Sequence, residues 1–165
     1  MKRPVIVGVM GGGSADRKDL DDACALGRLI AENGWILLNG GRDAGIMAAS
    51  AKGAAEAGGI TVGVLPDADA THAAPHIQIP ILTGMGNARN TINVLSSHVV
   101  VACPGGAGTL SEIALALKVG RPVVLLNFEA DLTRQPFAAH YRNGRLSGVE
   151  SPEAAIQKIK DLLKI

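Results

Sequence analysis

The sequence predicts an α/β fold in which a doubly wound, mostly parallel sheet carries helices on both faces. Short β-branched runs alternate with segments of helical apolar periodicity, in the order that consecutive βαβ units require. Most of these runs are apolar on both faces, as the strands of a helix-covered parallel sheet are. The 165 residues are expected to form a single domain, 1–165, with enough chain for a substantial core.

Each element of this fold has its own signal in the chain. We expect six strands, at Val5–Val9, Trp35–Leu38, Thr61–Leu65, Gln78–Leu82, Val99–Ala102 and Val123–Leu126. We expect five helices, at Lys18–Glu32, Gly45–Ala57, Ala88–Ser97, Thr109–Val119 and Pro152–Leu163. Ser151 is a favoured N-cap for the last helix, and Pro152 suits its first position. Loops are expected at Asp67–Pro75 and Asp131–Arg145. The alternation of strands and helices along the chain is Rossmann-like.

Composition argues against nucleic acid and membranes as partners. The net charge is +1 without a basic block, and aromatic residues make up 2%, so neither a phosphate-binding stripe nor a base-stacking surface is expected. No apolar run approaches the roughly 20 residues of a membrane span. We interpret the apolar N-terminal segment as a first strand rather than a signal peptide. Cys24 and Cys103 lie in apolar surroundings, which favours buried free thiols and a cytoplasmic protein.

Glycine-rich turns mark the expected binding site. The chain has 21 glycines, and four glycine-bearing turns follow predicted strands. In an open α/β sheet, ligands bind beyond the carboxyl ends of the strands. We therefore expect these turns to meet around one ligand. They are Gly11–Ser14, Gly40–Gly45, Gly84–Asn90 and Pro104–Thr109.

The segment Pro104–Glu112 has the features of a phosphate site. It lies between an apolar strand and a helical pattern, so free backbone N–H groups and the positive end of the helix dipole converge there. Thr109 adds a hydroxyl group, and Glu112 adds a carboxylate on the same helix face. The first turn has Asp16 where a dinucleotide fingerprint has its third glycine, and no P-loop motif occurs. A phosphorylated, nucleotide-like small molecule is therefore predicted as the ligand.

Three charged residues are candidates for this crevice, and each has a structural alternative. Arg89, at the start of a predicted helix, opposes the helix dipole. A contact with a ligand phosphate explains that placement, and the alternative is an ion pair, for example with Glu112. Glu112, in the expected first turn of its helix, suits stability alone as well as a ligand contact. Arg42 is either a second anion contact or a solvated surface charge. His72 and His76 are interpreted as loop residues, and no metal site is predicted.

Pro104–Glu112 matches the Pro-Gly-Gly-x-Gly-Thr-x-x-Glu signature of the LONELY GUY superfamily, long labelled "lysine decarboxylase". Its enzymes are phosphoribohydrolases that cut the base from a nucleoside 5′-monophosphate, and they use an upstream Arg together with the signature Glu. Arg89 stands at a similar spacing before Glu112, but the Lys that follows this Arg in the enzymes is replaced by Asn90. Gly34–Leu38 and Gly86–Asn90 look more like a sister group, the molybdenum cofactor carrier proteins, which bind a phosphorylated metallo-pterin without turning it over.

The resemblance implies two alternative functions. We favour a molybdenum cofactor carrier, a LOG-family protein that binds the cofactor as its ligand and requires no cofactor for catalysis. The alternative is a phosphoribohydrolase of the cytokinin-activating type acting on a nucleoside monophosphate, with Arg89 and Glu112 as catalytic residues. Related proteins form homodimers or homotetramers, so a homo-oligomer is expected. The predicted ligand-binding residues are Gly11, Gly12, Ser14, Gly40, Gly41, Arg42, Gly45, Gly86, Asn87, Arg89, Gly105, Gly106, Gly108, Thr109 and Glu112.

Overall fold

Short, mostly apolar strands pair in parallel in the computed structural model, which describes residues 3–128, 132, 141 and 145–165. In chain order the strands are β1 (Ile6–Met10), β2 (Ile36–Asn39), β3 (Thr61–Leu65), β4 (Ile79–Leu82), β5 (Val99–Ala102), β6 (Val123–Leu126) and β7 (Leu146–Val149). They form a seven-stranded sheet in the order β4-β3-β2-β1-β5-β6-β7. Every neighbouring pair is parallel, so the predicted mostly parallel sheet is entirely parallel.

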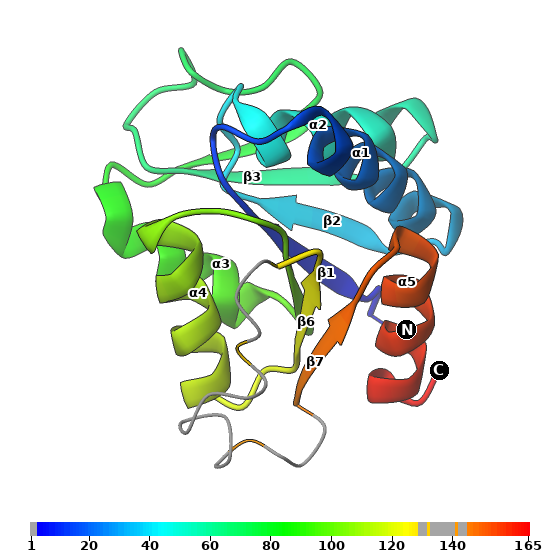
Figure 1. Ribbon diagram of the computed structural model, residues 1–165. Coiled ribbons are helices and arrows are strands. Elements are labelled where there is room, and N and C mark those ends of the chain that lie inside the picture. The colour runs from blue at the N-terminus through cyan, green and yellow to red at the C-terminus, as the bar shows by residue number, and fades with distance from the viewer. Residues whose placement is uncertain (1–2, 129–131, 133–140, 142–144) are drawn as a thin grey trace.

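Helices cover both faces of the sheet (Figure 1). They are α1 (Arg17–Glu32), α2 (Gly45–Glu56), α3 (Asn90–Ser96), α4 (Ala107–Lys118) and α5 (Pro152–Leu163), with a 3₁₀ helix, η1 (Gly86–Arg89), before α3. α1, α2 and α5 pack on one face, and α3 and α4 on the other. Side chains of a strand alternate between faces, so Val7 and Val9 of β1 join the first core and Met10 joins the second. The predicted doubly wound fold is confirmed.

The bounds of the predicted elements are confirmed to within one residue, apart from three differences. Strand β7 was not predicted, because its sequence Leu-Ser-Gly-Val has only two large apolar residues and no period to detect. The helix expected at Ala88–Ser97 is two elements, η1 and α3. α4 begins at Ala107 rather than Thr109. The loop expected at Asp67–Pro75 contains no helix or strand, and the one expected at Asp131–Arg145 lies largely outside the described residues.

Two glycines serve helix packing rather than turns. A Cβ at Gly27 of α1 would overlap the backbone oxygen of Ser50, and a Cβ at Gly53 of α2 would overlap that of Cys24. α1 and α2 therefore meet backbone to backbone, which only glycine permits. Part of the high glycine content thus comes from this contact and not from ligand-facing turns.

The winding of the sheet reverses between β1 and β5. The chain runs outward from β1 to β4 and then crosses to β5 on the other side of β1. This reversal places the turn after β1 beside the turn after β5, where the Gly12 N–H donates to the Pro104 carbonyl oxygen at 3.0 Å. Such a switch point is where ligands bind in open α/β sheets. Within the described residues, no helix is both long and apolar enough to cross a membrane.

Candidate ligand-binding site

A cavity of about 210 Å³ lies at this switch point. Predicted residues that line it are Gly11, Gly12, Gly40, Asn87, Arg89, Gly106, Gly108, Thr109 and Glu112. Residues not predicted for binding also line it: Val9, Met10, Gly13, Met47 and Asn90. The structure thus brings together parts of all four glycine-bearing turns. Their contact with a ligand remains a prediction.

Several of the predicted glycines do not line this cavity, and close packing or a positive φ accounts for them instead. A Cβ at Gly45 would overlap the Gly12 carbonyl oxygen, and one at Gly105 would overlap Thr109 Oγ1. Gly41 has a φ of 78°, which glycine adopts without strain. Gly86 has a φ of 55° and belongs to η1. These positions shape the turns, so the sequence pattern overstated how many glycines face the cavity.

Two polar residues on the predicted list also lie elsewhere. Ser14 borders a separate hollow near the start of α2 rather than the cavity. Arg42 forms an ion pair with Asp67 at 3.1 Å, and its side chain is 45% exposed. Arg42 does not line the cavity, which favours a surface charge, and a contact with an anion stays a prediction.

The N-terminus of α4 forms one wall of the cavity. Its N-cap is Gly106, and no side chain in the described part of the protein caps it. The N–H groups of the first helical turn have no partner within a helix, and the helix dipole makes this end positive. A Cβ added at Gly106 or at Gly108 would meet nothing within 4 Å. The fold does not need glycine at these two positions, and the missing side chains leave the helix end open to a ligand.

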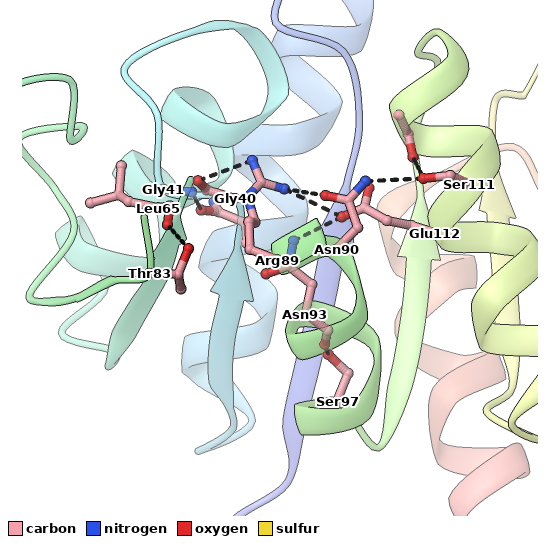
Figure 2. A network of polar contacts seen from close by, with 12 residues as sticks. Gly40, Gly41, Leu65, Thr83, Arg89, Asn90, Asn93, Ser97, Ser111 and Glu112 are labelled. Carbon is pink, nitrogen blue, oxygen red and sulfur yellow. Dashed lines mark hydrogen bonds and ion pairs between the residues drawn. The ribbon is translucent and has the colours of Figure 1, made fainter. Parts of the chain in front are cut away.

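Arg89 lines the same cavity as this helix end and is held by several oxygens (Figure 2). Its Nη1 donates to Asn90 Oδ1 at 2.6 Å, and its Nη2 donates to the Gly40 carbonyl oxygen at 3.5 Å. Nη1 is also 3.7 Å from Glu112 Oε1. Burial lowers the pKa of Arg89, and the Glu112 carboxylate opposes that shift. The ion pair offered as the structural alternative is therefore present, and it lines the cavity at the same time.

Glu112 is the acidic group of the site, and its side chain is only 7% exposed. Burial raises its pKa, which the hydrogen bond from Asn93 and the charge of Arg89 partly oppose. Asn93 Nδ2 donates to Glu112 Oε1 at 2.8 Å. Because α4 begins at Ala107, Glu112 lies beyond the first helical turn, and the expectation that the helix dipole stabilises it there is wrong.

Three polar residues in or next to the cavity were missed by sequence reasoning. Asn90 and Asn93 come from α3 and Ser111 from α4, and each hydrogen-bonds across to the other helix. The two asparagines did offer a signal: they are three residues apart on α3, and this spacing places both amides on one helix face. Among the described residues, no group of three or more His, Cys, Asp or Glu side chains could hold a metal ion.

The model of the SLOG cluster4 family matches residues 4–156, which is nearly the whole chain. The chain belongs to the SLOG cluster4 family. This confirms the LOG-like resemblance that was drawn from Pro104–Glu112.

Two solved structures resemble this SLOG cluster4 protein over its full length. The molybdenum cofactor binding protein from Rippkaea orientalis is 47% identical, with 99% of each chain covered and a TM-score of 0.92. The Moco carrier protein from Chlamydomonas reinhardtii is 45% identical, with 98% of this chain and 99% of that chain covered and a TM-score of 0.88.

An enzyme is also among the relatives of this SLOG cluster4 protein. The cytokinin riboside 5′-monophosphate phosphoribohydrolase of Mycobacterium tuberculosis is 34% identical over 119 residues. The match covers 66% of this chain and 62% of the enzyme. The likeness to the enzyme is thus lower and shorter than the likeness to the two cofactor-binding proteins.

Proposed function

We propose that this protein binds the molybdenum cofactor as cargo and acts as its carrier. The observation that carries the proposal is the likeness, over nearly the whole chain, to a cofactor-binding protein at 47% identity and a Moco carrier protein at 45%. The cavity supports it independently, because its donors suit the phosphate of a phosphorylated metallo-pterin. The carrier function requires only reversible binding.

The phosphate of the cofactor would be held between α4 and Arg89. The uncapped first turn of α4 offers backbone N–H groups, and Gly106 and Gly108 allow close approach. Arg89 lines the same cavity, and guanidinium matches phosphate oxygens in a bidentate manner. Thr109 is 3% exposed and lines the cavity, so its hydroxyl group is a further contact of the predicted kind.

The pterin would lie against the remaining walls. Met47 lines the cavity and is partly exposed, so its side chain offers apolar surface to a flat heterocycle. Glu112 would accept a hydrogen bond from a pterin N–H group. Ligand pockets typically enclose roughly 300–1,000 Å³, so a cavity of about 210 Å³ would enclose the phosphate and one edge of the pterin, with the rest of the cofactor outside it.

The proposal is tested by anaerobic calorimetry of the protein with molybdenum cofactor, with molybdate as the matched control. We expect saturable binding of the cofactor and much weaker binding of molybdate, because molybdate resembles the phosphate group but lacks the heterocycle. A titration in which the cofactor gives no saturable signal would reject the carrier function.

A phosphoribohydrolase is the second candidate function. The similarity to the Mycobacterium tuberculosis enzyme favours it, together with the presence of Arg89 and Glu112 at one cavity. Arg89 would hold the 5′-phosphate, and Glu112 would stabilise an oxocarbenium-like ribosyl centre or orient water. Incubation with AMP and cytokinin monophosphates tests this function. Free base released by the wild type but not by Glu112→Gln would establish it and remove the purely carrier function.

The homo-oligomer expected for the protein is supported by strand β4. This edge strand is exposed at every residue, and Ile79, Ile81 and Leu82 are 40–48% exposed. An uncovered apolar edge strand favours association, and a second copy of the chain is the proposed occupant. Light scattering tests it: a mass of two or four times 16.9 kDa is expected, and Ile81→Lys should lower it. A wild type that remains at 16.9 kDa would contradict the proposal.

A further inference from the structure

Arg89 is anchored most closely by the residue that follows it. Asn90 is 7% exposed, and its Oδ1 accepts from Arg89 Nη1 at 2.6 Å. The other contacts of the guanidinium are longer, because the Gly40 oxygen is at 3.5 Å and Glu112 Oε1 is at 3.7 Å. The orientation of the amide is determined by chemistry: a guanidinium can only donate, so the oxygen of Asn90 must face it.

The amide of Asn90 leads on to the glycine turn of α4. Its Nδ2 donates to Ser111 Oγ at 3.0 Å, and Ser111 Oγ donates to the Gly108 carbonyl oxygen at 2.6 Å. Nδ2 has only hydrogens to give, so Ser111 must accept from it and give its own hydrogen to Gly108. A single, directed chain of hydrogen bonds thus joins Arg89 to the first turn of α4 (Figure 2).

The chain leaves part of Arg89 available for a ligand. A guanidinium carries five N–H groups. Asn90 accepts one hydrogen from Nη1 and Gly40 accepts one from Nη2, and Nη1 also faces Glu112 Oε1 at 3.7 Å. The second N–H of Nη2 therefore has no partner in the described part of the protein. Nε is buried without a partner there. The guanidinium is therefore held firmly on one side and still lines the cavity.

We infer that Asn90 is a positioning residue that joins Arg89 and the start of α4 into one preorganised anion cradle. The inference rests on the proposed function, because it concerns how the same site holds the phosphate of its ligand. Preorganisation raises affinity by removing the cost of ordering a long side chain on binding. Asn90 acts through Arg89 and need not touch the ligand.

The test is a double-mutant cycle of Asn90→Ala with Arg89→Ala. For each variant, the dissociation constant of molybdenum cofactor is measured, and that of inorganic phosphate is measured by ³¹P NMR. Loss of a hydrogen bond to a charged group predicts a roughly tenfold weaker binding in Asn90→Ala. The same substitution should have no further effect once Arg89 is already alanine. Ser111→Ala, at an exposed residue, should give a smaller loss and remains informative where Asn90→Ala does not fold.

Ser97→Ala is the matched control. It removes a buried hydrogen bond of 2.7 Å to the Asn93 carbonyl oxygen, from the same region of α3 but outside the chain to Arg89. The Ser97→Ala variant should bind phosphate with the affinity of the wild type. Equal binding by wild type and both chain variants would overturn the inference, as would an equal loss with and without Arg89. If the wild type binds phosphate but not the cofactor, the carrier function is rejected. The double-mutant cycle measured with phosphate then still tests the anion cradle.

Discussion

The Glu112 carboxylate lies 3.7 Å from the Arg89 guanidinium, and both groups line one cavity with side chains that are 7% and 13% exposed. A buried charge is costly unless it is paired, so each of the two side chains offsets the free-energy cost of burying the other. The pair would also let a cation and an anion share the proposed phosphate site. Arg89 would direct its charge toward the ligand, while Glu112 is held by Asn93 on α3.

The first prediction concerns pH. Burial raises the pKa of Glu112 above its ordinary value of 4.5. An acid whose pKa is raised in the folded state binds protons more tightly there, so its contribution to stability is present below pH 4.5 and is lost as pH rises through the folded-state value. Urea unfolding from pH 4 upward should therefore show the wild type losing free energy of unfolding relative to Glu112→Gln. Two parallel pH curves would show that Glu112 does not titrate in this way.

A second prediction separates the roles of two glycines on the same turn. Gly108→Ala places a methyl group in open space on α4, so it should leave the protein equally stable or more stable by up to about 1 kcal/mol. The same methyl group should weaken cofactor binding, because Gly108 lines the cavity. Gly105→Ala should instead lower stability, since its Cβ would lie 2.8 Å from the Gly12 nitrogen. Thermal unfolding with cofactor titration of both variants would show either pattern. Unchanged cofactor affinity in Gly108→Ala would be inconsistent with a ligand at this helix end.

The third prediction contrasts two arginines. Arg89→Ala should weaken cofactor binding by roughly 10- to 100-fold, the loss expected when a charged hydrogen-bond partner is removed. It should also destabilise the fold, because Glu112 would remain buried without its ion-pair partner. Arg42→Ala removes an exposed ion pair with Asp67 and should change stability by no more than about 0.5 kcal/mol, with unchanged affinity. Equal affinities of the two variants would remove Arg89 from the phosphate site.

A fourth prediction tests the contact between α1 and α2. Gly53→Ala should destabilise the protein by about 1–3 kcal/mol, because its Cβ would overlap the backbone of Cys24 and force the helices apart. Gly108→Ala is the matched substitution in a helix with free space, and its effect should have the opposite sign or be absent. Denaturant midpoints of the two variants measure the difference. A neutral Gly53→Ala would mean that the two helices can separate without cost.

Local patterns were sufficient for most of the fold. Apolar runs such as Val99–Ala102 predicted buried strands, and the Ser151–Pro152 start of α5 is confirmed to the residue, with Ser151 Oγ accepting from the Ala154 N–H. Strand β7 was missed because its pairing with β6 depends on the neighbouring strand rather than on its own sequence. An edge position or a crossover cannot be read from a run of four residues.

The site was predictable in its backbone but not in its polar support. Turns such as Pro104–Thr109 are visible because glycine is rare at such density, and the order of parallel strands brings them to one edge. Asn90 and Ser111 were missed, since an Asn or Ser in a helix is more often solvated than paired with another helix. Gly27 and Gly53 were not singled out for a related reason: a glycine indicates a close approach, but it does not indicate which partner approaches.

The most direct test of the carrier function is the molybdenum that remains with the protein after incubation with molybdenum cofactor and anaerobic gel filtration. The proposed cofactor site predicts close to one molybdenum per chain for the wild type, and much less for the Arg89→Ala variant measured beside it. Molybdenum that elutes entirely apart from the wild-type protein would contradict the central claim.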